Sequence, residues 1–331
     1  MAEATLTGYV QIGVNNNKTT TTGTATTATT LADSNANTAL NFTDVEDLGD
    51  GLKVTTNIGL LPSIGSSSTL GGQTTYAALS GGFGELKAGK FGNDQFWTVV
   101  TGDATGYMGS NAATVNLAFG ATAASTTVYS ASTLTTSATV GSAEVWTANQ
   151  VRYQLPTFVP GLTLAYTNKL GGQTDGTYGA ETVTGSYTTG GLSTQLTATQ
   201  FKASTSATDT LTSIAASYDF GMAKLYALST SAKIAAVGTV TGRNIGVSVP
   251  VGAITVMYNN SSADGYLYNR AITAVDQTSQ DIGFTYAFSK RTTAWVLFTT
   301  YDGSTKGQGG GGTTNATSGY DSMRVMLTHA F

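Results

Sequence analysis

The chain has 331 residues and a formal net charge of −4, and only 10% of its residues are charged. Soluble domains usually carry about 25% charged residues, and nucleic-acid-binding proteins usually present a basic face, so the composition disfavours both classes. Helical membrane proteins need runs of about 20 apolar residues, and the sequence has no such run. Because the chain lacks cysteine and has one histidine, disulfides, thiol chemistry and a typical zinc site are also excluded.

The first half of the chain predicts strands joined by alternating short and long connections. Residues 4–14 alternate apolar and polar side chains, which is typical of a strand with one apolar face. A threonine-rich polar loop is predicted at 15–37. The next two strands are predicted to meet at DLGDG, residues 47–51, and the following two at GGFG, residues 81–84, because such glycine-rich pairs favour tight turns.

The least regular stretch covers about 91–142, and a loop of that length is usually functional or disordered. A short strand is expected within it, near 126–130. The remaining strands are predicted at 146–155 and 162–169, in pairs around the turns at 188–191, 219–222, 249–252 and 289–291, and at the C-terminus after a glycine-rich loop at 302–319.

The last residues, 320–331, predict a strand that continues to the terminal phenylalanine. Val325 and Leu327 fall on one face, and Arg324 and Thr328 fall on the other. A strand at the very end of a chain needs partners on both edges, which a closed barrel supplies, and an apolar outside with a polar inside suits lipid and water. We therefore expect one all-β domain over residues 1–331, a closed transmembrane antiparallel barrel of about 16 strands.

Five segments resemble the general porins of Gram-negative bacteria. They are ATLTGYVQ at 4–11, VEDLGDGLK at 45–53, LKAGKFG at 86–92, NQVRY at 149–153 and LTHAF at 327–331. The second is the most specific. The resemblance implies a homotrimer in the bacterial outer membrane, in contact with outer-membrane lipid and lipopolysaccharide. It also implies passive diffusion of small hydrophilic solutes and ions. Because the first residues lead straight into a strand pattern, the chain is expected either in mature form after removal of a signal peptide or as a protein that is not exported, and we favour the mature form.

The resemblance further implies a third loop, at about 91–125, that folds into the barrel and narrows it. Its acids would be Asp94 and Asp103. The basic residues facing them are assigned either from the family match or from strand alternation. Alternation favours the lumen for a charged side chain, because a charge facing lipid at mid-bilayer costs about 2–4 kcal/mol. The predicted constriction residues are Asp94, Asp103, Lys53, Lys87, Lys90, Arg152 and Arg324. Regular alternation places Lys87 and Lys90 on opposite faces of the strand, because they are three residues apart. A bulge near Gly89 would allow both to face the lumen.

Two departures from the family predict weak ion selectivity. LNF at 40–42 stands where the family commonly has an arginine, and Thr328 replaces its usual basic residue before the terminal histidine. No enzyme activity, cofactor or metal is expected, and His329 is predicted to be structural. Two alternatives stay open: a substrate-selective channel of the same fold, for an organic acid or a sugar, and a secreted β-rich adhesin. The adhesin would show a fixed short repeat, whereas the loop lengths alternate.

Overall fold

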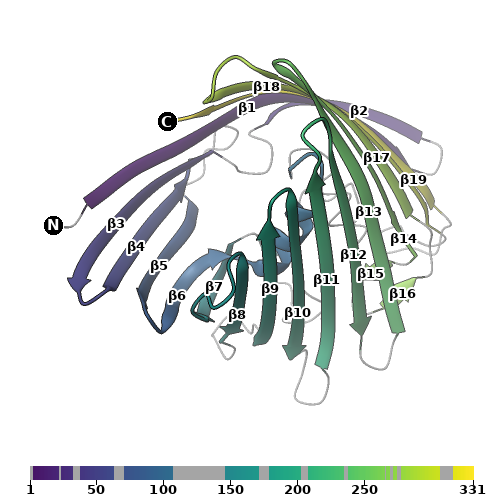
Figure 1. The fold of residues 1–331 in the computed structure, drawn as a ribbon. Coiled ribbons are helices and arrows are strands. Elements are labelled where there is room, and N and C mark those ends of the chain that lie inside the picture. The colour runs from purple at the N-terminus through teal and green to yellow at the C-terminus, as the bar shows by residue number, and fades with distance from the viewer. Residues whose placement is uncertain are drawn as a thin grey trace.

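Alternating side chains build long strands that curl into a closed barrel in the computed structural model of the chain (Figure 1). The structure describes residues 3–21, 24–32, 38–62, 71–106, 146–170, 179–202, 208–234, 238–264, 266–268, 271–273, 277–305 and 316–331.

The elements follow the chain in this order: β1 (Glu3–Thr21), β2 (Thr24–Ala32), β3 (Ala39–Gly49), β4 (Leu52–Leu61), β5 (Gly71–Gly81), β6 (Gly84–Gly92), α1 (Asp94–Thr101), β7 (Trp146–Gln154), β8 (Leu162–Lys169), β9 (Ala180–Thr189), β10 (Leu192–Lys202), β11 (Thr208–Asp219), β12 (Lys224–Ile234), β13 (Gly238–Val251), β14 (Ile254–Ala263), β15 (Tyr266–Tyr268), β16 (Ala271–Thr273), β17 (Gln277–Ala287), β18 (Thr292–Thr305) and β19 (Ala316–Ala330).

In the described part of the chain, seventeen strands form one sheet, and its last strand pairs with its first. The barrel is sixteen-stranded because β2 and β3 together occupy one position in the wall. The β1–β19 ladder runs from Tyr9 opposite Ala330 to Thr21 opposite Ser318. Below it, Gly8 and Phe331 exchange two backbone hydrogen bonds of 3.0 Å each. The other edge of β1 pairs first with β3 and then with β2, so these two strands continue each other along one edge. The β15–β16 hairpin forms a separate sheet. The predicted closure of the barrel is confirmed.

The two faces of the wall differ in polarity along each strand. In β1 the outward Val10, Ile12 and Val14 are exposed, whereas the inward Gln11 is completely buried. Tyr153 and Tyr166 are register partners on the outward face, and each exposes about two fifths of its surface. An outer surface of exposed aliphatic and aromatic side chains is the surface that a bilayer covers.

Short turns and the chain end share one rim of the barrel. The turn between β3 and β4 places Asp50 and Gly51 at positive φ, 52° and 78°, which glycine and aspartate tolerate best. Asp47 Oδ1 accepts a 2.9 Å hydrogen bond from the Gly49 N–H in the same turn. In the described ranges, no helix combines the length and apolar character needed to cross a bilayer.

Three predicted boundaries are wrong because strands extend further than their apolar alternation. The expected loop at 15–37 is largely the β1–β2 hairpin, because its threonines are β-branched and favour strands. The expected loop at 302–319 is shorter than predicted, since β18 extends into it from one side and β19 from the other. The turn expected at 249–252 lies at Gly252 and Ala253, since β13 continues through Pro250. The β15–β16 hairpin was not anticipated, and the strand expected near 126–130 lies outside the described residues.

We expect Gly8→Val to destabilise barrel closure. A Cβ at Gly8 would lie 1.9 Å from Cζ of Phe331, so the terminal ring must swing away, and overpacking of this kind typically costs about 1–3 kcal/mol. Thermal unfolding in detergent, followed by circular dichroism, should show a lower midpoint. Gly82→Ala is the control, because a Cβ there meets nothing within 4 Å; equal midpoints for the two variants would contradict the prediction.

Candidate pore constriction

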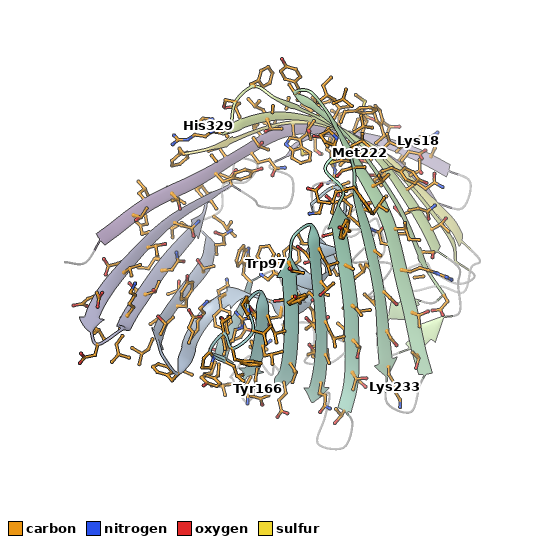
Figure 2. The ribbon with its side chains drawn as sticks, viewed as in Figure 1. Lys18, Trp97, Tyr166, Met222, Lys233 and His329 are labelled. Carbon is orange, nitrogen blue, oxygen red and sulfur yellow. The ribbon has the colours of Figure 1, made fainter. Side chains whose placement is uncertain are left out.

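The third long connection enters the barrel as a short helix, α1, directly after β6. The Asn93 side chain caps the helix by accepting a 2.8 Å hydrogen bond from the Gln95 N–H, and Asp94 sits in the first turn, where a negative charge suits the helix dipole. Figure 2 shows Trp97 of this helix inside the ring of strands. The helix therefore brings charged and aromatic side chains into the lumen.

One side of α1 is fixed to the wall at β10 and β11. Gln95 Nε2 donates 2.9 Å hydrogen bonds to Oγ1 of Thr199 and to the carbonyl of Leu211. The hydroxyls of Thr98 and Thr197 lie 2.6 Å apart. All of these side chains are buried, and hydrogen bonds at buried sites are costly to break. The position of the helix is thus defined by polar contacts as well as by packing.

The segment after α1 is held by two buried asparagines of the wall, Asn244 of β13 and Asn259 of β14, here called the asparagine anchor. Asn244 Nδ2 donates a 2.8 Å hydrogen bond to the Gly102 carbonyl. Asn259 Nδ2 donates to the Asp103 carboxylate, and its Oδ1 accepts from the Ala104 N–H at 3.1 Å. This anchor holds the loop against a wall strand more than 150 residues further along the chain.

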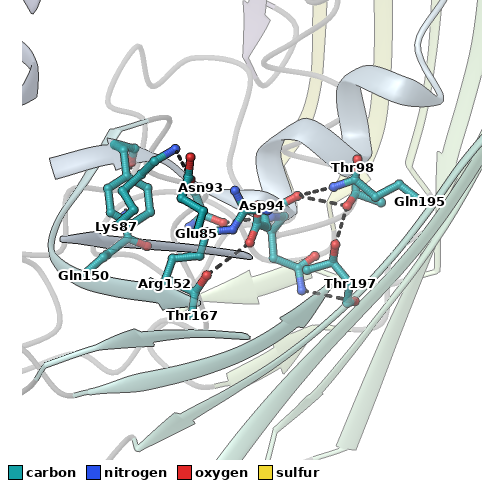
Figure 3. Close-up of polar contacts among 12 residues, drawn as sticks. Glu85, Lys87, Asn93, Asp94, Thr98, Gln150, Arg152, Thr167, Gln195 and Thr197 are labelled. Atoms are coloured by element: carbon teal, nitrogen blue, oxygen red, sulfur yellow. Dashed lines mark hydrogen bonds and ion pairs between the residues drawn. The ribbon is translucent and has the colours of Figure 1, made fainter. Parts of the chain in front are cut away.

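Asp94 pairs with a wall cation, as Figure 3 shows. Its Oδ1 lies 3.6 Å from Nη2 of Arg152 on β7, and its Oδ2 accepts a 3.3 Å hydrogen bond from the Thr167 hydroxyl of β8. The Gln195 amide of β10 donates to the Asp94 carbonyl at 3.1 Å. The Asp94 and Arg152 side chains are only 11% and 18% exposed, so solvent screens this pair less than a surface pair.

Lys87 lies beside Arg152 in the β6–β7 register and has its own partners. Its Nζ is 3.1 Å from Oε1 of Glu85 and lies over the ring of Tyr76, 4.9 Å from the centroid. A ring face attracts a cation at this distance. The described lumen wall at β6 and β7 therefore carries two cations, each beside an acid, and the four charges sum to zero.

The structure brings together Asp94, Lys87 and Arg152 but distributes the other four predicted residues elsewhere. Asp103 is buried at the asparagine anchor, and Arg324 lies in β19 in register with Asn15. Lys53 is exposed next to the turn that opens β4. Lys90 is in register with the exposed Thr75, on the face opposite to Lys87, after Gly89 at φ 136° where the β6–β7 register shifts. A bulge was expected near Gly89, and the β6–β7 pairing is irregular there, but it does not bring Lys90 to the same face as Lys87.

Sequence reasoning missed the residues that hold the loop: Gln95, Thr98, Asn244 and Asn259. One signal was available, because asparagine is depleted in strands and both asparagines occupy inward positions of otherwise regular strands. Among the described residues, no group of three His, Asp or Glu side chains is placed to hold a metal ion.

A barrel with this wall and an inward-folded helix defines an outer-membrane channel. The sequence profile of the Gram-negative porins matches residues 1–322. The chain therefore belongs to the Gram-negative porin family, which places it in the bacterial outer membrane. No curated protein matches the sequence.

Several solved structures share the fold at low sequence identity. The anion-selective porin from Comamonas acidovorans has a TM-score of 0.71 at 19% identity and covers 100% of both chains. OmpF of Salmonella typhi, in complex with daunomycin, has a TM-score of 0.65 at 12% identity and covers 99% of this chain and 97% of its own. The channel DcaP of Acinetobacter baumannii has a TM-score of 0.63 at 13% identity, covering 100% of this chain and 97% of its own.

Proposed function

We propose that this porin is a passive diffusion channel for small hydrophilic solutes and ions, working without covalent chemistry. The observation that carries the proposal is the helix fixed inside a closed barrel whose outer face is apolar and whose inner face is polar. Such a helix narrows an aqueous path without closing off its polar lining. The width of the path would set the size limit, and fixed charges would set the ion preference.

At the constriction we assign Asp94, Lys87 and Arg152 as the charges that permeating ions meet first. Support comes from their inward positions and from their low but finite exposure. For Asp103 we propose a role in holding the loop, since its carboxylate accepts hydrogen bonds from Thr105 and Asn259. Lys53 and Arg324 would modulate the field from β4 and β19. We propose no role in the constriction for Lys90, because it lies on the face of β6 opposite to Lys87.

A homotrimer is the proposed assembly. OmpT of Vibrio cholerae, described in a trimer form, has a TM-score of 0.62 at 10% identity and covers 100% of this chain and 99% of its own. The closed barrel and the family membership leave the adhesin alternative without support.

The test is reconstitution of the purified protein in planar bilayers. We expect discrete conductance steps and a reversal potential near zero in a KCl gradient, because each described lumen cation at β6 and β7 has an acid beside it. The electrostatic fields of two adjacent opposite charges largely cancel for an ion about one Debye length away, which is ~10 Å at 0.1 M salt. Absence of steps in repeated preparations would refute the channel, and a steep preference for one ion sign would refute the cancellation.

A further inference from the structure

The closed barrel sets which strands face the helix across the lumen. Counted around the sixteen-stranded wall, β3 and β11 are eight positions apart in either direction. The same separation relates β1 to β10 and β4 to β12. Because α1 packs against β10, β11 and β12, the surface of α1 that points away from them faces β1, β3 and β4.

That surface of α1 presents an indole. Gln95, Thr98 and Val99 are buried toward the wall, whereas Trp97 is 41% exposed. The ring is held in place by edge contacts with Phe96 and Trp146, at centroid distances of 5.0 and 6.2 Å. A Cβ on Gly92 would lie 2.3 Å from Nε1 of this ring. Trp97 is thus a supported aromatic platform inside the barrel (Figure 2).

Midway along β3 and β4, the facing wall carries uncharged hydrogen-bonding groups. Asn57 Nδ2 donates a 2.9 Å hydrogen bond to the Thr43 hydroxyl, and the Thr74 hydroxyl donates to Asn57 Oδ1. Asn41 lies beside them, 3.5 Å from the same Thr74 hydroxyl. Asn57 is the sixth residue of β4 from the short-turn rim, and Thr197, which Thr98 of the helix contacts, is the sixth of β10. The Trp97 ring contacts Gly92 and Trp146, the ninth residues of β6 and β7 from the same rim, so it lies above the level of Asn57.

An indole opposite amides and hydroxyls suits a particular chemistry. The C–H face of a pyranose packs on an aromatic ring, and its hydroxyls can donate to and accept from asparagine and threonine side chains. An ion crossing between these two surfaces finds no opposite charge in Trp97, Thr43 or Asn57. The nearest described ion pairs, Asp94–Arg152 and Glu85–Lys87, are each neutral as a pair.

We propose that Trp97 and the facing Asn41 and Thr43, which the buried Asn57 and Thr74 hold in place, form a binding subsite for uncharged carbohydrates at the constriction. The subsite deepens the proposed diffusion channel and rests on it. A monosaccharide would pause between the indole and the amide wall while it permeates, and its charged analogue would gain no matching interaction there.

The test is the current noise of single channels in KCl when D-glucose is added, with potassium D-glucuronate as the charged probe, because it keeps the pyranose ring. We expect glucose, and not glucuronate, to produce concentration-dependent blocking noise. Trp97→Ala should weaken the apparent glucose affinity about three- to tenfold, the range expected for losing one aromatic contact. Trp97→Phe should retain most of the affinity. Phe284→Ala, which removes an outward aromatic ring of β17, should leave it unchanged.

Three outcomes would overturn the subsite while leaving the channel intact: no glucose noise in the wild type, equal noise with glucuronate, or equal glucose affinity in Trp97→Ala and wild type. Conductance in KCl alone separates these results from failure of the channel itself, because a protein that forms no pores gives no current before any sugar is added. The Trp97→Ala protein should still give discrete KCl steps, which shows that the barrel has folded, and its step size is expected to rise because the indole no longer occupies the lumen.

Discussion

Asn259→Leu should convert a quiet channel into one with frequent current fluctuations. The side chain keeps a similar size but can no longer donate to the Asp103 carboxylate or accept from the Ala104 N–H. The buried Ala104 N–H is then left without its partner, which costs about 1–3 kcal/mol, whereas Asp103 keeps its hydrogen bonds from Thr105. The balance between held and released loop should therefore shift by about five- to 150-fold. Single-channel records should show new conductance levels, and the mean conductance should change.

Asn260→Leu is the matched control for this variant. Asn260 is the next residue of the same strand and lies on the exposed outward face, so the same substitution there leaves the asparagine anchor intact. We expect its records to resemble the wild type. If Asn259→Leu is also as quiet as the wild type, the contacts of Gln95 and Thr98 suffice to hold the loop and the anchor has no role in setting the pore.

Asp94→Asn should move the reversal potential toward anion preference. The substitution leaves Arg152 without the carboxylate now 3.6 Å away, which exposes one positive charge to the lumen. A unit charge about 10 Å from an ion in water changes the energy of that ion by roughly 0.4 kcal/mol, favourably for the anion and unfavourably for the cation. With partial screening at 0.1 M salt, the anion-to-cation permeability ratio should therefore rise about two- to fourfold. The measurement is the reversal potential in a KCl gradient.

The double variant Asp94→Asn, Arg152→Gln separates charge from shape. It removes both members of the pair, so the net charge returns to its original value and the reversal potential should return close to that of the wild type. Asp103→Asn should shift the reversal potential less than Asp94→Asn, because the Asp103 side chain is buried at the anchor. A double variant that stays anion-preferring would show that the selectivity arises from loop displacement.

The charge contacts at the constriction show where sequence reasoning stops. Alternation assigned Arg152 to the lumen, because a cation facing lipid is costly, but it could not identify Asp94 as its partner. The two residues lie on segments separated by the third long connection, and their 3.6 Å contact depends on where α1 comes to rest. Lys90 shows the same limit: motif matching would place it in the lumen, whereas the β5–β6 ladder continues in register and puts Lys90 opposite the exposed Thr75, on the other face from Lys87.

By itself, the sequence determined the strand alternation, the tight turns and the closure of the barrel, because a bilayer outside and water inside impose a two-residue period on every strand. Those are local properties, readable within about ten residues. Only the tertiary structure decided how far β1 and β19 extend, that a helix would carry Trp97 into the lumen, and that Asn259 would hold the loop. These features depend on contacts between distant segments, which exist only after the barrel has closed and its strand stagger is set.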